Sequence, residues 1–191
     1  MNIVQLSILS GSIACLAATG CAAADSASFR AMAATDHERV ASTGGDAAPA
    51  EEHLAAAREL RERERSACAE VPDVDRDQGP FARRDRIVAT KELRARLFPK
   101  APEQTVGVSV EIRATPGTTE QWLGRIVQCH LAHYAVVGGA SADPGDPLTT
   151  PGARVSVAAT QVGFRVAITS PSSEVARQLL EKGLALSAKG T

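Results

Sequence analysis

The stretch TVGVSVEIRATPGTTEQWLGRIVQCHLAHYAVVGG, residues 105–139, changes its hydrophobic period at the turn Pro116-Gly117. Before the turn, Val and Ile alternate with small or charged residues, which is typical of a strand with one buried and one wet face. After the turn, Thr118 and Gln121 have the spacing of a capping box. The pattern predicts a helix from about Glu120 to Val137 that ends at two glycines. We therefore expect a strand, a turn and a helix in succession at the centre of the fold.

Three further segments alternate in the same way: RIVATKEL (86–93), ARVSVAAT (153–160) and FRVAITS (164–170). The last two are separated by a short turn that contains glycine, and they predict a β-hairpin. A final helix is expected from Ser170-Pro171 to about Leu186. The resulting order, β-β-α-β-β-α, predicts an α+β fold. We expect a two-layer sandwich in which helices cover one face of an antiparallel sheet.

The chain before these strands divides by composition. Residues 21–48 are mostly Ala, Ser, Gly, Thr and charged residues without a sustained period, and we expect a disordered tether. Residues 49–70 are rich in Ala, Leu, Glu and Arg and predict one long charged helix with a thin apolar stripe. Residues 71–191 then form the small α+β domain, which begins with VPDVDRDQGPF (71–81), a turn-rich connector.

Residues 1–20 carry no charged side chain, and their apolar stretch is too short and interrupted for a membrane span. They fit the apolar region of a signal peptide. Small residues then lead into Cys21, and this junction resembles the lipobox of bacterial lipoproteins. The resemblance implies that Cys21 carries lipid. Ala22 rather than Asp after it favours an outer-membrane lipoprotein that faces the periplasm. The alternative is a secreted or periplasmic soluble protein.

Cys68 and Cys129 remain after the signal peptide, an even pair in an oxidising compartment. The leading interpretation is a disulfide between them, which would fasten the charged helix to the domain. An alternative is a zinc or copper site, because Cys129, His130 and His133 lie within five residues of one helix. A redox-active thiol is the third interpretation, although neither cysteine is expected at a helix N-terminus, where a thiolate is favoured.

The composition and the absence of known motifs argue against several other classes of protein. The net charge is −1 and aromatic residues make up 3% of the chain, so we expect no nucleic-acid partner. The sequence has no phosphate-binding P-loop, dinucleotide fingerprint, nucleophile elbow, zinc-protease motif or C-x-x-C pair. We therefore expect no enzyme and no cofactor.

Residues 51–186, over most of their length, resemble a group of uncharacterised bacterial proteins that are often predicted lipoproteins. The most specific pieces are a D-R-D-x-G-P-F turn and a W-L-x-R-x-V-x-C-H-L-A helix. The group commonly has Arg where this chain has His133, and often Cys-Pro-Leu where this chain has Asp146-Pro147-Leu148. Both departures count against a shared metal site. The resemblance implies an envelope location and no particular activity.

The expected function is that of a lipid-anchored protein of the cell envelope with a non-catalytic interaction or structural role. Its partners would be the membrane, through the lipid on Cys21, and an envelope protein of unknown identity. The alternative from another class is a periplasmic metal-binding protein that uses the Cys/His helix, with Cys129, His130 and His133 as ligands.

Overall fold

The computed structural model describes residues 31–44, 47–96, 98–138 and 145–188. Contacts divide the chain into residues 1–32 and 33–191, and every helix and strand named below belongs to the second unit. The expected signal peptide, Cys21 and the first part of the expected tether lie outside the described residues.

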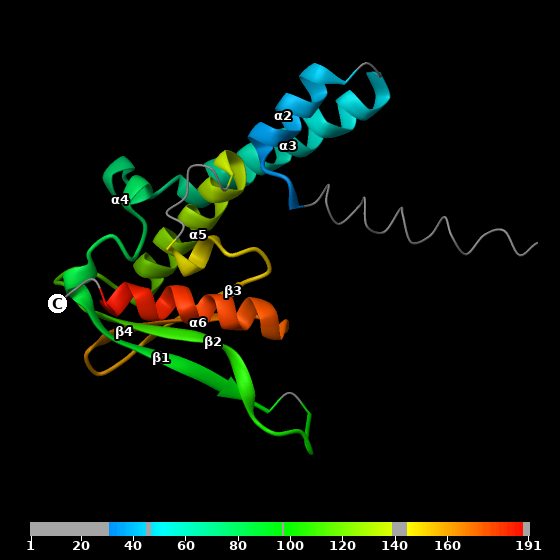
Figure 1. Ribbon diagram of the computed structural model, residues 1–191. Helices are drawn as coiled ribbons and strands as arrows, with labels where there is room; N and C mark the ends of the chain where they lie inside the picture. Colours follow the sequence, from blue (N-terminus) through cyan, green and yellow to red (C-terminus); the bar gives the residue numbers. More distant parts are fainter. Residues whose placement is uncertain (1–30, 45–46, 97, 139–144, 189–191) are drawn as a thin grey trace, which may run out of the picture. The chain divides into compact units, whose positions relative to one another are not determined.

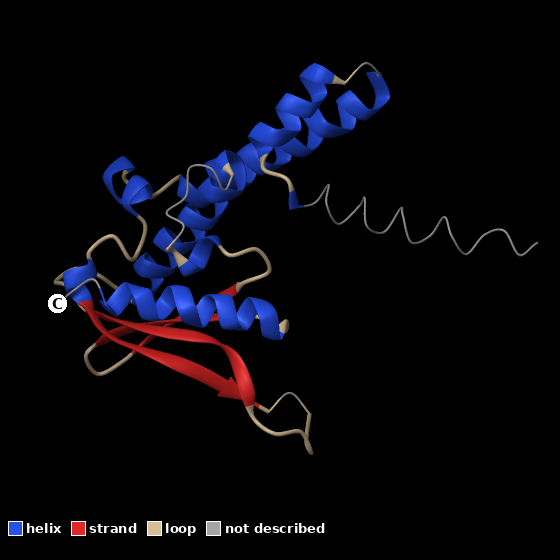
Figure 2. Cartoon of the chain, in the orientation of Figure 1, coloured by secondary structure: helices blue, strands red, loops and turns tan. Residues whose placement is uncertain are grey.

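Four strands form one antiparallel sheet in the order β1-β2-β4-β3 (Figure 2). They are β1 (Ile87–Ala95), β2 (Gln104–Arg113), β3 (Arg154–Ala159) and β4 (Gly163–Thr169). β2 and β4 are the two central strands, and β1 and β3 are the two edges. The predicted α+β class and antiparallel sheet are confirmed.

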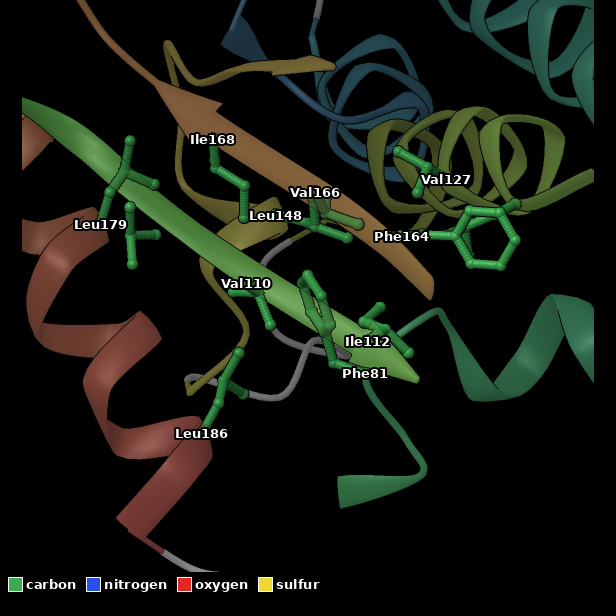
Figure 3. Packing of buried hydrophobic residues seen from close by; sticks show 12 residues of the cluster. Phe81, Val110, Ile112, Val127, Leu148, Phe164, Val166, Ile168, Leu179 and Leu186 are labelled. Atoms are coloured by element: carbon green, nitrogen blue, oxygen red, sulfur yellow. The ribbon is translucent and has the colours of Figure 1, made fainter. Parts of the chain in front are cut away.

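Two helices cover one face of this sheet: α5 (Glu120–Val137) contacts β3, and α6 (Ser173–Ala188) packs mainly on β1 and β2. The alternating apolar residues of β2 and β4 point into this layer, because Val110 pairs with Val166 and Val108 with Ile168. Figure 3 shows how Val127 from α5 and two leucines from α6 meet them. Burying these side chains is the main favourable contribution to the fold, at about 25 cal/mol per Å² of apolar surface.

α2 (Ala34–Thr43) corrects the expectation of a tether over residues 21–48. It lies antiparallel beside α3 (Ala47–Cys68), which is the predicted charged helix (Figure 1). The sequence signal is weak because only small or polar residues face inward: Ala34 is 0% exposed and His37 is 2% exposed. His37 Nδ1 lies 2.7 Å from His53 Nδ1 on α3. Tertiary packing, rather than local propensity, therefore makes this segment helical.

Two further local details differ from expectation. The connector contains a short helix, α4 (Asp73–Gln78), before a glycine with φ of 63°. The start of α5 is at Glu120 as predicted, but its N-cap is Thr119, whose hydroxyl accepts a hydrogen bond from Trp122 N at 3.1 Å. Thr118 instead bonds Thr115 through their hydroxyls at 2.7 Å. Thr118 and Thr119 could each have capped the helix, and the hydroxyl of Thr119 does so because that of Thr118 is bonded to Thr115.

None of the described helices is both long enough and apolar enough to cross a membrane.

Candidate functional site

Cys68 and Cys129 form a disulfide, with an S–S distance of 2.01 Å and a Cα–Cα distance of 4.7 Å. Cys68 is the last residue of α3, and Cys129 lies in the middle of α5. The two cysteines are 2% and 0% exposed, and Val71 and Ile126 pack around them. The pair that the sequence favoured thus lies at disulfide distance, and it joins the charged helix to the layer that covers the sheet.

The structure does not bring the proposed metal ligands together. Cys129 faces Cys68, whereas His133 Nδ1 lies 2.5 Å from Glu64 Oε1 on α3 and His130 Nε2 lies 2.9 Å from Asp146 Oδ2. Each of the three side chains therefore has a different partner. Within residues 31–188, as far as they are described, no group of three or more His, Cys, Asp or Glu side chains could hold a metal ion.

The His130–Asp146 pair fastens a loop to α5. Asp146 Oδ1 accepts a hydrogen bond from Leu148 N at 2.8 Å, so the carboxylate also caps the short η3 helix (Pro147–Thr149). On its other side the imidazole lies against Gly79, where an added Cβ would be 2.9 Å from the ring. His130 therefore fills the space between two connectors. His130 thus joins α5 to the loop through Nε2, while its buried Nδ1 has no hydrogen-bond partner among the described residues.

A cavity of about 450 Å³ lies beside the disulfide, between the end of α3 and α4. Its lining residues are Arg61, Glu64, Arg65, Cys68, Ala69 and Arg76. Arg61 donates to both carboxylate oxygens of Glu38 at 2.8 Å. This side-chain hydrogen bonding lowers the pKa of Glu38 and raises the pKa of Arg61. The three arginines that line this cavity, Arg61, Arg65 and Arg76, each form an ion pair with a carboxylate of the protein.

A larger groove, of about 590 Å³, lies along the free edge of β3. One wall is Val155 and Val157 of β3, the floor includes Val127 of α5, and the other wall is the end of α3 with the two residues that follow it. Polar side chains stand at the rim. The lining residues are Ser66, Ala67, Ala69, Glu70, Glu120, Gln121, Gly124, Arg125, Val127, Gln128, Val155 and Val157. An apolar floor with a polar rim is the usual composition of a binding groove.

The backbone of β3 also faces this groove. Thr160 N donates to Gly163 O at 2.8 Å, which marks that pair as hydrogen-bonded across the hairpin. Since hydrogen-bonded and non-hydrogen-bonded pairs alternate in an antiparallel ladder, Val155, Val157 and Ala159 direct their N–H and C=O groups away from β4. Glu120 Oε2 accepts from Ala159 N at 2.8 Å. For Val155 and Val157, no hydrogen bond within the described part of the chain takes up these groups.

Sequence reasoning identified the disulfide pair but missed this groove. Its walls come from three segments that are far apart in the chain, so no local pattern records it. One signal was present: Gly124 lies inside the continuous helix α5 and lines the groove. A glycine inside a helix lowers the stability of the helix by about 1 kcal/mol relative to alanine. A glycine at such a position therefore indicates a packing or functional requirement.

Comparison with known proteins adds no assignment: no family model, curated protein or solved structure matches this chain.

Proposed function

We propose that the chain is a lipid-anchored domain of the cell envelope that binds a partner protein and has no catalytic role. The observation that carries the proposal is the buried Cys68–Cys129 disulfide. Disulfides persist in oxidising compartments and are rare in the cytosol, so the pair supports export of the chain. Export agrees with the apolar N-terminal segment and with the small residues that lead into Cys21.

The binding role is supported by the groove along β3. His130 and His133, the two histidines of the expected metal site, are held in contacts that fasten one element to another. The groove instead combines apolar side chains with backbone groups on a free sheet edge. These are features of recognition rather than of bond-making chemistry.

The anchor is tested with the full chain and its Cys21→Ala variant in a bacterial host. We expect radiolabelled palmitate in the wild type and none in the variant, and only the wild type should sediment with membranes. A variant that still fractionates with membranes would contradict the anchor.

The Cys68–Cys129 disulfide is tested on the exported wild-type chain. Digestion without reductant should yield one peptide pair joined through Cys68 and Cys129, detected by mass spectrometry. Two free thiols in the exported protein would remove the support for the proposal. The Cys21→Ala variant serves as the matched control, because loss of the lipid should leave the disulfide in place.

A further inference from the structure

We propose that the groove beside β3 binds an extended segment of a partner protein, which joins the sheet as a fifth strand next to β3. The inference rests on the proposed function only in that the chain binds a partner; it does not depend on the lipid anchor. Addition of a strand to a sheet edge obtains affinity from main-chain hydrogen bonds and specificity from alternate side chains.

The two edges of the sheet differ in how they are protected. β1 carries Lys91, Glu92 and Arg94, and its pairing with β2 has two irregularities, near Ile87 and Leu93. Charged side chains and bulges are the devices by which proteins prevent unwanted pairing at an edge. β3 has the sequence RVSVAA, with its one charge at the first position and a regular register. The unprotected edge is therefore the one that borders the groove.

Gly124 provides an independent observation. α6 also contains a glycine, and a Cβ at Gly183 would lie 2.5 Å from Val108 Cγ2, so close packing explains that residue. A Cβ at Gly124 would meet nothing within 4 Å. Within the described part of the domain, packing gives no reason for the cost of a helical glycine at this position. Its effect is to leave space in the groove opposite the edge of β3.

The shape of the groove favours one strand over a second copy of the chain. Ser66, Ala67 and Glu70 form the wall that faces β3. A two-fold dimer that paired β3 with β3 would bring a second α3 to the same edge, because a two-fold interface uses the same surface on both subunits. A single extended segment avoids this overlap and can use the backbone groups of Val155 and Val157.

The side chains of the groove define the segment further. Residues of the segment that face Val127, Val155 and Val157 should be apolar, and they should alternate with polar residues that face away. At the rim, Arg125 is paired with Glu70, while Glu120 accepts from Ala159 N. Glu70 and Arg125 balance each other, and Glu120 leaves the rim with one additional negative charge. The rim therefore favours a basic residue in the segment over an acidic one.

The probe is a peptide that copies residues 163–169 (GFRVAIT), because β4 already pairs with β3 in a defined antiparallel register. Its binding to the full-length disulfide-bonded chain is measured by fluorescence anisotropy. A peptide of the same composition with its apolar residues adjacent instead of alternating is the control. We expect the first peptide to bind and the control peptide to bind at least about tenfold more weakly.

Two substitutions at one position separate groove filling from folding. Gly124→Ala adds a single methyl group and should keep binding, whereas Gly124→Gln should fill the groove and weaken binding at least about tenfold. Both should raise the melting temperature, since both replace a helical glycine. No binding by the wild type, or equal binding by both variants, would overturn the inference.

Amide exchange identifies the edge itself. Bound peptide should slow exchange of the Val155 and Val157 N–H groups, while Ser156 N–H, which faces β4, should change little. Binding without protection of Val157 would place the peptide elsewhere, and a dimer of the free chain protected at the same two amides would assign the edge to a second copy. Either result refutes strand addition by a partner, while lipid labelling and the disulfide would still support the proposed export and anchoring of the chain.

Discussion

At the scale of single residues, two glycines allow the central strands to approach. Gly107 begins the part of β2 that pairs with β4, and Gly163 begins β4, so they stand at opposite ends of the β2–β4 ladder. A Cβ at Gly107 would lie 2.0 Å from Ile168 O, and one at Gly163 would lie 2.1 Å from Ile112 O. Both contacts are with backbone atoms that cannot move without disturbing the ladder. The two positions therefore require glycine for reasons of space.

We predict that Gly107→Ala destabilises the domain by at least about 2 kcal/mol, because overlap with the backbone forces the central strands apart. Gly117→Ala is the matched control: its φ is 83°, but an added Cβ would meet nothing within 4 Å. Backbone strain alone should cost the control about 1 kcal/mol. Urea unfolding followed by circular dichroism measures both, and equal losses would contradict the steric explanation.

At the scale of elements, the disulfide decides how α3 is attached. α3 is a charged helix with few buried residues, Ala57 and Cys68. Its contacts with α5 include the disulfide and the Glu64–His133 pair. A single partly buried hydrogen bond of this kind contributes about 1 kcal/mol. The covalent bond is therefore the strongest link between α3 and the layer that covers the sheet.

Replacing both cysteines by alanine should destabilise the domain by roughly 4 kcal/mol. The bond spans a sequence separation of 61 residues, and closing such a loop restricts the unfolded chain by about that amount. Urea unfolding of the wild type with and without reductant checks the value. Reductant should have no effect on the double variant, and a wild type insensitive to reductant would show that the bond contributes little.

The Arg61–Glu38 pair joins α2 to α3 and should make their association sensitive to acid. Hydrogen bonding from Arg61 lowers the pKa of Glu38 in the folded chain below the ordinary value of a glutamate side chain. The stabilisation is therefore present above the unfolded pKa and is lost as the pH falls through the folded pKa. Because both side chains are about two-fifths exposed, at 43% and 40%, we expect no more than about 1 kcal/mol.

Glu38→Gln should remove this part of the pH dependence. Thermal unfolding between about pH 3 and pH 7 should show a shallower acid limb for the variant than for the wild type. In an Arg61→Gln background, the same substitution should have no further effect, because the two residues act as one pair. Identical acid limbs for wild type and Glu38→Gln would disprove the coupling.

At the scale of the whole molecule, α2 belongs to the folded unit. Ala34 packs with Ala57 of α3 and Val136 of α5, so three helices share one small cluster. Removing α2 would expose this cluster and His53 to water. A boundary drawn at residue 49 or 71, as composition indicated, would therefore divide a packed core.

We predict that deleting residues 1–43 lowers the melting temperature by several degrees, as the loss of about 1–2 kcal/mol would do in a domain of this size. Deleting residues 1–31 should leave it unchanged, since α2 and Ala33 remain. Differential scanning calorimetry compares the two truncations with the full chain. Equal melting temperatures for the two truncations would show that α2 contributes little to the stability of the domain.

The periodic elements were predictable because local patterns record which side of a segment is buried. The predicted helix from Glu120 to Val137 has the observed bounds, and the charged helix expected over residues 49–70 is Ala47–Cys68. The prediction of secondary structure was wrong where the local sequence pattern was weak, and where two neighbouring residues fitted the same role. The buried residues of α2 are small or polar, so its helix was not predicted. Thr118 and Thr119 both have the side chain of an N-cap, and the structure uses Thr119.

The sequence alone predicted the fold class and most helix and strand segments, because periodicity acts over short stretches. It also favoured the pairing of Cys68 with Cys129 over two other interpretations, because these two cysteines remain once the expected signal peptide and Cys21 are set aside. Tertiary structure was needed for the strand order, for the helical state of α2 and for the separation of Cys129, His130 and His133 onto three partners. It was needed above all for the groove beside β3. These features depend on contacts between segments distant in the chain, and such contacts leave little trace in local composition.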